Sequence, residues 1–380
     1  MASNPLLILA ILCGSVVLAE WLVRRTPLRH LGTALVVIIV VAVWANLGLI
    51  PSASQGSAVY DGVFRYLAPL SIFYLLLDVN LASIRRAGAP MLLLFLLGSA
   101  GTALGVVAGM YLIDGPGQFG EFYPAISGMF TGTYTGGSVN YNAIAIHYDM
   151  MREGVLYAGM TAVDNIITAV WMVITLAVPL VLRRWGTGEV RRAVAVDDDV
   201  ERESESVSVL SLGILLGVGF LSLAAADAIT LWLADLGYDV PSILVLTSLA
   251  LVLAQLPYFH RLEGGQVLGL FFVYLFLAVI GAFCDLAALG QIGDLAWALL
   301  ALVTVIVLIH GTLVFGVTTL FKLDPDVAAV ASQANIGGSS SALALAKSLD
   351  RMDLYLPGIL VGALGNGLGT YLGFLVAGLA

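Results

Sequence analysis

The chain has 380 residues, of which 60% are hydrophobic and 11% are charged, and its formal net charge at pH 7 is −9. Soluble domains carry about 25% charged residues, so this composition excludes an ordinary soluble protein and predicts an integral membrane protein. The acidic balance also gives no indication of a nucleic-acid partner.

Apolar runs of about 20 residues, the length that crosses a bilayer, recur along the whole chain. In the first half they lie at 5–23, 31–50, 60–78, 90–113 and 155–182, and in the second at 208–234, 241–258, 266–284, 292–321 and 355–379. A glycine-interrupted segment precedes the last run of each half, at 121–150 and at 325–350. We therefore expect an all-α integral membrane fold whose halves each contain about five transmembrane helices plus a Gly-Gly-broken helix or re-entrant hairpin.

The two interrupted segments share a residue pattern with constant spacing. The matched positions are Pro124, Gly136, Gly137, Ser138, Ala143, Ala145, Asp149, Met151, Ala162 and Asn165, which return as Pro325, Gly337, Gly338, Ser339, Ala344, Ala346, Asp350, Met352, Ala363 and Asn366. This internal duplication predicts a first repeat at 1–182, a polar cytoplasmic linker at 183–207 and a second, inverted repeat at 208–380. Paired glycine-interrupted segments in two halves indicate the binding site of a secondary transporter.

The arginines favour a hairpin over a crossing helix at 121–150. Basic residues of short loops prefer the cytoplasm, and a crossing helix would place four arginines outside. These four are Arg183, Arg184, Arg191 and Arg192. A hairpin keeps them inside and leaves an odd number of spans in each half, so the second half is inserted upside down. The predicted location is the cell (inner) membrane, with multiple spans.

Both breaks are rich in groups that bind ligands. Glycines free backbone N–H and C=O groups, and the helix that starts near Ser138 directs its positive end at the break, so an anionic guest is expected. The predicted substrate-binding residues are Thr133, Thr135, Gly136, Gly137, Ser138, Asn140, Asn142, Gln333, Asn335, Gly337, Gly338, Ser339 and Ser340. The alternative is that Gly, Ser and Thr only allow close helix packing.

Asp164 lies within the apolar run 155–182. Inserting a carboxylate there costs about 3 kcal/mol on translocon scales, so Asp164 should face the protein interior or water. We expect it to couple transport to an ion, as a ligand of Na⁺ or a carrier of H⁺, together with Asn165 and its counterpart Asn366. A carboxylate satisfied structurally by its neighbours is the alternative. His310 is interpreted as a histidine that hydrogen-bonds a neighbouring helix, with a proton relay as its alternative.

The chain lacks the motifs of ATP-binding proteins and of nucleophilic hydrolases, so we expect no enzyme and no cofactor beyond Na⁺ or H⁺ as coupling ion. The predicted function is secondary active transport, as Na⁺- or H⁺-coupled symport of a small carboxylate, amino acid or peptide-like anion. A monovalent cation/proton antiporter is one alternative, and a non-transporting membrane receptor or structural protein is another. The expected partners are a small anionic solute, the coupling ion and the lipid bilayer, and a homodimer remains open.

Three motifs carry a resemblance to a known family, namely the stretches 132–140, 162–165 and 334–339. They resemble the DUF819 (YjcL-like) membrane proteins over nearly the whole chain. More remotely, the layout is similar to the sodium/glutamate symporters and citrate carriers, and to the cation/proton antiporter and bile-acid symporter clan. That resemblance implies inverted five-span halves. In antiporters of the clan an acidic pair binds the ion, and here Asn165 follows Asp164, which argues against a two-carboxylate antiport mechanism.

The predicted topology is tested by cysteine labelling in intact cells, in a background without Cys13 and Cys284. Ala195→Cys, in the linker, should react only with a membrane-permeant reagent because the linker is cytoplasmic. Glu121→Cys is the control, since its loop is expected outside and should react with an impermeant reagent. Labelling of Ala195→Cys by the impermeant reagent would contradict the hairpin topology.

Overall fold

The computed structural model describes residues 4–30, 32–52, 57–77, 79–184, 207–238, 240–259, 262–284 and 293–380, and within these ranges it contains helices and turns but no β-strand. Seven of the described helices are long and apolar enough to cross a membrane. The prediction of an all-α integral membrane protein is therefore confirmed. Most of the predicted linker, at 185–206, lies outside the described residues.

The described helices lie on both sides of the predicted linker. The first half contains α1 (Pro5–Arg25), α2 (Gly32–Asn46), α3 (Ala58–Gly62), α4 (Ala68–Leu76), α5 (Ala89–Leu112), α6 (Gly115–Phe119), α7 (Tyr123–Gly136), α8 (Ser138–His147) and α9 (Gly154–Arg184). The second half contains α10 (Val209–Asp235), α11 (Ser242–Leu253), α12 (Gly265–Ala282), α13 (Gly293–Leu320), α14 (Pro325–Ser348) and α15 (Tyr355–Ala377). A π-helical turn at Val63–Leu67 joins α3 to α4, so the chain is helical from Ala58 to Leu76 within the predicted run 60–78.

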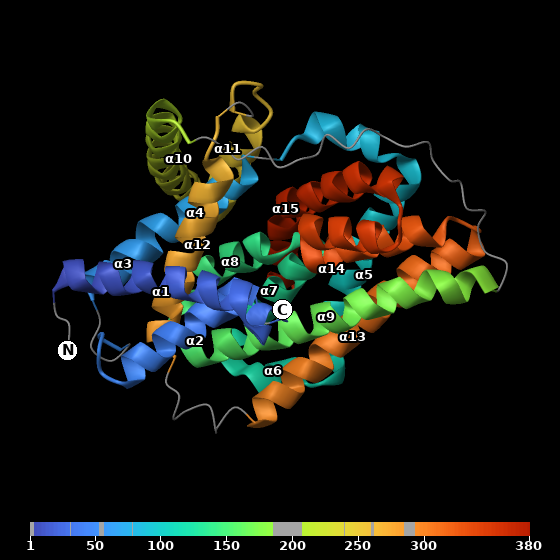
Figure 1. Ribbon diagram of the computed structural model, residues 1–380, viewed down its shortest axis with the longest axis horizontal. Coiled ribbons are helices and arrows are strands. Elements are labelled where there is room, and N and C mark those ends of the chain that lie inside the picture. Colours follow the sequence, from blue (N-terminus) through green and yellow to red (C-terminus); the bar gives the residue numbers. More distant parts are fainter. Residues whose placement is uncertain are drawn as a thin grey trace.

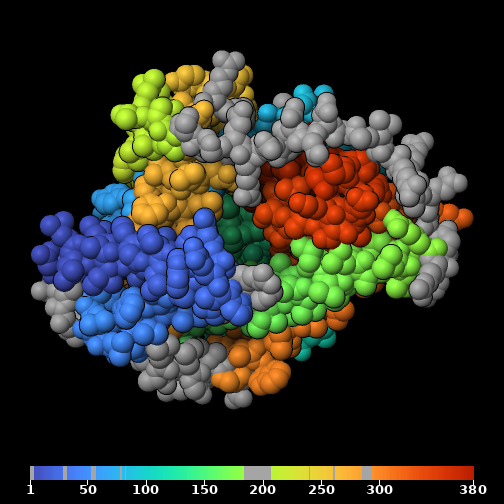
Figure 2. Space-filling view, in the orientation of Figure 1, coloured from blue at the N-terminus to red at the C-terminus, as the bar shows by residue number. Residues whose placement is uncertain are grey.

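The helices form two bundles, each built from both halves of the chain (Figure 1). We call α1 to α4 and α10 to α12 the flanking bundle, in which α2 packs against α12 and α4 packs against both α11 and α12. The hairpin bundle consists of α5, α7, α8, α9, α13, α14 and α15, in which α5 packs against α13 and α7 against α15. Figure 2 shows the blue and gold helices of the flanking bundle beside the green and red helices of the hairpin bundle.

The first interrupted segment folds back on itself. A Cβ atom placed on Gly132 would lie 3.1 Å from the Cβ atom of Asn140, and one placed on Gly128 would lie 3.1 Å from Cγ2 of Ile144. Both pairs are centred on Gly136, so α8 runs antiparallel alongside α7. This geometry favours the hairpin over a single crossing helix.

The second interrupted segment also folds back, at a kink within α14 where Gly338 leaves helical geometry. A straight helix of its 24 residues would be about 36 Å long. Yet Arg351, which follows the end of α14, donates a hydrogen bond of 2.8 Å to Asp324, which precedes the start of α14. A Cβ atom on Gly358 of α15 would touch both arms, at 2.8 Å from Val330 and 3.4 Å from Ala342. The membrane side on which each hairpin opens stays a prediction.

The two breaks meet inside the hairpin bundle. Gly137 has φ 104° and Gly338 has φ 74°, backbone conformations that L side chains rarely adopt. A Cβ atom on Gly137 would lie 3.8 Å from the Cα atom of Gly338. Two segments about 200 positions apart thus touch backbone to backbone, as the roughly constant spacing of the duplication allows.

Close backbone crossings hold α15 against both hairpins. A Cβ atom on Gly362 would lie 2.6 Å from the Cα atom of Ser339, and one on Gly136 would overlap the carbonyl group of Gly365. Small residues at such crossings allow van der Waals contact between helices where lipid provides no hydrophobic driving force.

Replacing Gly365 by Ala should therefore destabilise the purified protein by about 1–3 kcal/mol, because the added methyl group meets the backbone of Gly136 and Thr135. The measurement is the thermal unfolding midpoint in detergent. Gly213→Ala in α10 is the matched control, since its Cβ atom would meet nothing within 4 Å. Equal unfolding midpoints for the two variants would contradict the crossing.

Candidate functional site

A cavity of about 230 Å³ lies between the two bundles. The hairpin bundle contributes α8 and α9 to its wall, and the flanking bundle contributes α2, α4 and α12. The lining residues are Ala34, Leu75, Ser138, Val139, Tyr141, Asn142, Tyr157, Thr161, Asp164, Leu270, Val273, Tyr274 and Leu277. The hairpin bundle thus supplies most of the polar wall, and the flanking bundle supplies a mainly apolar one.

Three of the predicted site residues, Ser138, Asn142 and Asp164, line this cavity together. Sequence reasoning missed Tyr157 and Thr161, which lie seven and three positions before Asp164 and therefore share its helix face. The Tyr157 hydroxyl donates to Oδ1 of Asn142 at 2.5 Å, which links α9 to α8. The spacing from Asp164 is the signal that could have found both residues.

The N-terminus of α8 opens at the cavity without a cap. Gly137 has no side chain to cap the helix, and the N–H of Asn140 bonds the carbonyl of Gly137 at 3.1 Å. Within the described part of the chain, the N–H groups of Ser138 and Val139 have no hydrogen-bond partner. Uncapped N–H groups at the positive end of a helix are suited to an anionic group.

Asp164 reaches this cavity from α9. Its Oδ1 atom is buried and has no hydrogen-bond partner in the described residues, and the same holds for the hydroxyl oxygens of Tyr134 and Tyr141. The Tyr134 hydroxyl faces the Asp164 carboxylate, and both tyrosines interact with that carboxylate electrostatically. Each unsatisfied buried polar group costs about 1–3 kcal/mol, so a cluster of such groups needs an explanation.

Asn140 and Asn335 lie away from the cavity, and their side-chain amides bond to neighbouring helices. Asn140 donates to the Gly365 carbonyl at 3.1 Å and accepts from the Thr370 hydroxyl at 2.8 Å, so it fastens α8 to α15. Asn335 accepts from the Ser99 hydroxyl at 2.8 Å and donates to the Phe95 carbonyl at 3.0 Å, so it fastens α14 to α5. In this structure these two predicted substrate ligands therefore hydrogen-bond neighbouring helices to each other, and we call them struts for that reason.

The other predicted residues are distributed around the breaks and outside the cavity lining. Thr133 and Thr135 are buried in α7, and Thr135 donates back to the Thr131 carbonyl. Gln333 is buried and accepts a hydrogen bond from Thr175, while its Nε2 atom has no partner in the described residues.

The remaining predicted residues are more accessible or lie beside residues already described. Ser340 is exposed, and Gly337 packs beside Ser341. Asn165 is partly buried next to Asp164.

Asn366, the counterpart of Asn165, lies beside the first break. A Cβ atom on Gly137 would lie 3.9 Å from the Oδ1 atom of Asn366. The two candidate ion-coupling amides thus lie in different surroundings, because only the first half carries the neighbouring carboxylate of Asp164.

His310 is buried between three helices. Its Nδ1 atom lies 2.9 Å from the Gly98 carbonyl oxygen, and its Nε2 atom lies 2.9 Å from the Ser332 hydroxyl oxygen. The Trp171 ring packs edge-on against the imidazole. These contacts agree with the interpretation of a histidine that bonds neighbouring helices.

A cluster of ion pairs joins the end of α9 to both ends of α14. Arg183 pairs with Asp326, and Arg351 donates to Asp326 at 2.7 Å and to Asp324 at 2.8 Å. Arg351 also pairs with Asp353. Sequence reasoning missed this cluster because it joins three places in the chain, near residues 183, 324 and 351.

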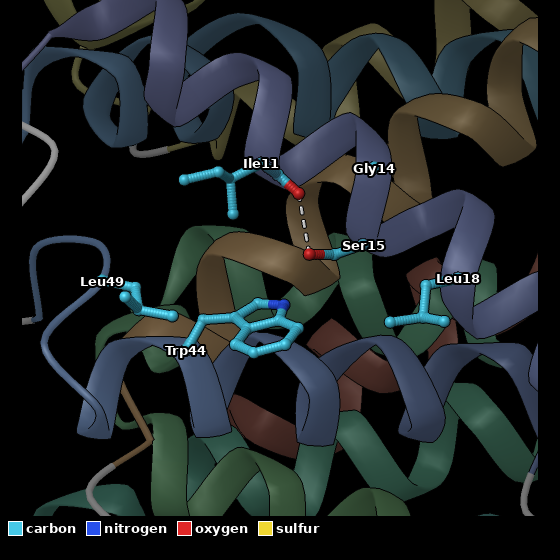
Figure 3. A pocket seen from close by; sticks show the side chains of 6 residues that line it. All are labelled: Ile11, Gly14, Ser15, Leu18, Trp44 and Leu49. Carbon is cyan, nitrogen blue, oxygen red and sulfur yellow. Dashed lines mark hydrogen bonds between the residues drawn. The ribbon is translucent and has the colours of Figure 1, made fainter.

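A second hollow, lined by Ile11, Gly14, Ser15, Leu18, Trp44 and Leu49, lies between α1 and the end of α2 (Figure 3). Among these lining residues, Ser15 carries the hydroxyl group, and it donates to the Ile11 carbonyl at 2.7 Å. This hollow therefore offers an apolar surface and lacks the unsatisfied polar groups of the cavity beside Asp164.

Long apolar helices in two bundles, with a cavity that carries polar side chains beside a broken helix, define a transporter-like, multi-span protein of the cell membrane. The chain belongs to the DUF819 family: the family model, described as "Protein of unknown function (DUF819)", matches residues 7–379. The chain is also similar to the "Uncharacterized membrane protein YjcL" of Bacillus subtilis (strain 168). The two are 29% identical over 349 residues, which cover 87% of this chain and 85% of that protein.

The different surroundings of Asn140 and Ser138 predict different consequences of substitution. Asn140→Ala should lower the free energy of unfolding by about 1–3 kcal/mol, because it leaves buried partners on α15 unsatisfied. Ser138→Ala should change the free energy of unfolding by no more than about 0.5 kcal/mol from the wild-type value, because the Ser138 side chain lines the cavity and does not join two helices. Thermal unfolding of the purified variants distinguishes the two, and a stable Asn140→Ala variant would contradict the role as a strut.

Proposed function

We propose that this protein is a secondary active transporter that carries a small carboxylate-bearing solute in symport with Na⁺ or H⁺. The observation that carries the proposal is the cavity between the bundles, where the uncapped N-terminus of α8 and the carboxylate of Asp164 line the same space. The helix N-terminus provides a place for an anionic group, and the carboxylate provides one for a cation. A solute and a coupling ion would thus bind side by side.

The volume and wall of the cavity support a small solute. About 230 Å³ is below the range of roughly 300–1,000 Å³ typical of drug-sized ligands. Leu75, Leu270 and Leu277 of the flanking bundle offer an apolar wall for a short aliphatic part of the solute. The proposed class therefore comprises small carboxylates, amino acids and short peptide-like anions.

The arrangement of the bundles supports a movement between them. The hairpin bundle carries the breaks and most of the polar wall, and its parts are joined by Asn140, Asn335 and His310. Transport would follow from a rigid-body displacement of this bundle against the flanking bundle, which would expose the cavity on alternate sides.

A cation/proton antiporter remains the second candidate, because the unpartnered carboxylate oxygen of Asp164 could exchange one cation for another. Proteoliposomes separate the candidates. Symport gives accumulation of a labelled carboxylate that collapses with the Na⁺ or H⁺ gradient. Antiport gives proton release on addition of Na⁺ without any organic solute. A receptor or structural protein gives neither.

Asp164→Asn should abolish uphill accumulation of the solute while the protein still folds, because the amide keeps the shape of the carboxylate and removes its charge. The measurement is uptake of radiolabelled amino acids and small carboxylates into proteoliposomes under Na⁺ and pH gradients. Asp114→Asn, in the turn before α6, is the control with the same chemical change away from the cavity. Unchanged accumulation in Asp164→Asn would show that coupling does not depend on this carboxylate.

A further inference from the structure

Three oxygen atoms without hydrogen-bond partners converge from three helices of the hairpin bundle. They are Oη of Tyr134 on α7, Oη of Tyr141 on α8 and Oδ1 of Asp164 on α9. The two tyrosines are at most 4% exposed, so bulk water does not satisfy their hydroxyl groups. Such a convergence of buried, unsatisfied oxygens is expected where a ligand completes the site.

We propose that Tyr134, Tyr141 and Asp164 form a Na⁺ site and that Na⁺ is the coupling ion. This inference rests on the proposed function as a transporter, and it names the ion and two ligands beyond Asp164. The donor atoms are all oxygens, with one negative charge among them, which is the set that a hard cation prefers.

The surroundings of Asp164 favour an external cation over an internal partner. The described basic residues that form ion pairs, among them Arg183 and Arg351, do so with other carboxylates. Tyr134 and Tyr141 are close enough to the carboxylate to interact with it electrostatically, and neither brings a positive charge. The negative charge of Asp164 is thus left for a mobile ion to balance.

A fourth oxygen lies next to the cluster. The Thr161 hydroxyl donates its proton to the Tyr157 carbonyl at 2.8 Å, which leaves its lone pairs for another group. The Tyr141 hydroxyl faces Thr161, so this oxygen borders the same space. A cation there would be within reach of four oxygens from three helices, whereas a proton would bind to the Asp164 carboxylate alone.

The charge of the cavity explains why a cation is needed for an anionic solute. Its described lining includes one acidic side chain and no basic one. An anion at the N-terminus of α8 would therefore share a cavity of about 230 Å³ with the Asp164 carboxylate, and the two negative charges would repel each other. Na⁺ bound to that carboxylate removes the repulsion, so binding of the ion and binding of the solute favour each other.

Direct binding of ²²Na⁺ to the purified full-length protein at pH 7.5 tests the site without any organic solute. The wild-type protein should bind Na⁺ saturably, with displacement by unlabelled Na⁺ but not by an equal concentration of K⁺. Asp164→Asn should lose this binding. Tyr134→Phe and Tyr141→Phe, which each remove one oxygen, should weaken it at least tenfold.

Tyr60→Phe is the matched control, because Tyr60 is equally buried but its hydroxyl donates to the Pro51 carbonyl at 2.8 Å within the flanking bundle. It should bind Na⁺ like the wild type. Thermal unfolding in K⁺ shows whether each variant is folded, and a folded Tyr141→Phe variant suffices if Tyr134→Phe does not fold.

The outcomes separate the Na⁺ site from the transport function. Absence of saturable Na⁺ binding in the wild type, with uptake of the solute driven by a pH gradient, would overturn the Na⁺ site and leave proton-coupled transport in place. Wild-type Na⁺ binding in either folded Tyr→Phe variant would also overturn the three-residue site. Saturable Na⁺ binding lost in the variants, without accumulation of any solute, would support the site and contradict the transporter.

Discussion

The contact between the two chain breaks is the constraint on which the rest of the structure depends. Within a bilayer, backbone N–H and C=O groups need partners in the protein or a water-filled cavity, so a broken helix is tolerated only where protein surrounds it. Gly137 and Gly338 turn the chain at positive φ, and their backbones lie against each other. Each break is thereby shielded from lipid by the other, while the start of α8 still opens at the cavity.

Surrounding helices keep this contact in place with polar struts and close crossings. Asn140 ties the first hairpin to α15, and Asn335 ties the second to α5. Gly365 lets α15 approach the backbone of Gly136, where any larger side chain would collide. Because these bonds lie within the hairpin bundle, that bundle is held as one unit, and its boundary with the flanking bundle is where the cavity lies.

Charged side chains form ion pairs at one end of the hairpin bundle, whereas the carboxylate at the cavity forms none among the described residues. At one end of the hairpin bundle, Arg351 is surrounded by Asp324, Asp326 and Asp353, so buried charges are paired there. At the cavity, Asp164 faces hydroxyl groups. Paired charges are suited to fixing the two ends of a hairpin, while an unpaired carboxylate is suited to binding something that enters and leaves.

The sequence by itself determined the class of the protein and the position of both breaks. Hydrophobic length is a local property, and Gly136-Gly137-Ser138 and Gly337-Gly338-Ser339 mark the breaks through local backbone freedom. Asp164, Ser138 and Asn142 were also recognisable from the sequence, since a polar side chain in an apolar span is costly to insert into the membrane unless it faces the protein interior or a cavity.

Only the tertiary structure decided which polar residues line the cavity and which tie helices together. Asn140 and Asn142 are two positions apart in one helix, yet the first bonds α15 while the second lines the cavity. Tyr134 and Tyr141 likewise become neighbours of Asp164 only because the fold brings side chains of α7 and α8 to α9. The physical reason is that lipid and the protein interior are both apolar. The hydrophobicity of a membrane helix therefore varies little around its axis, and the sequence does not show which face packs against another helix.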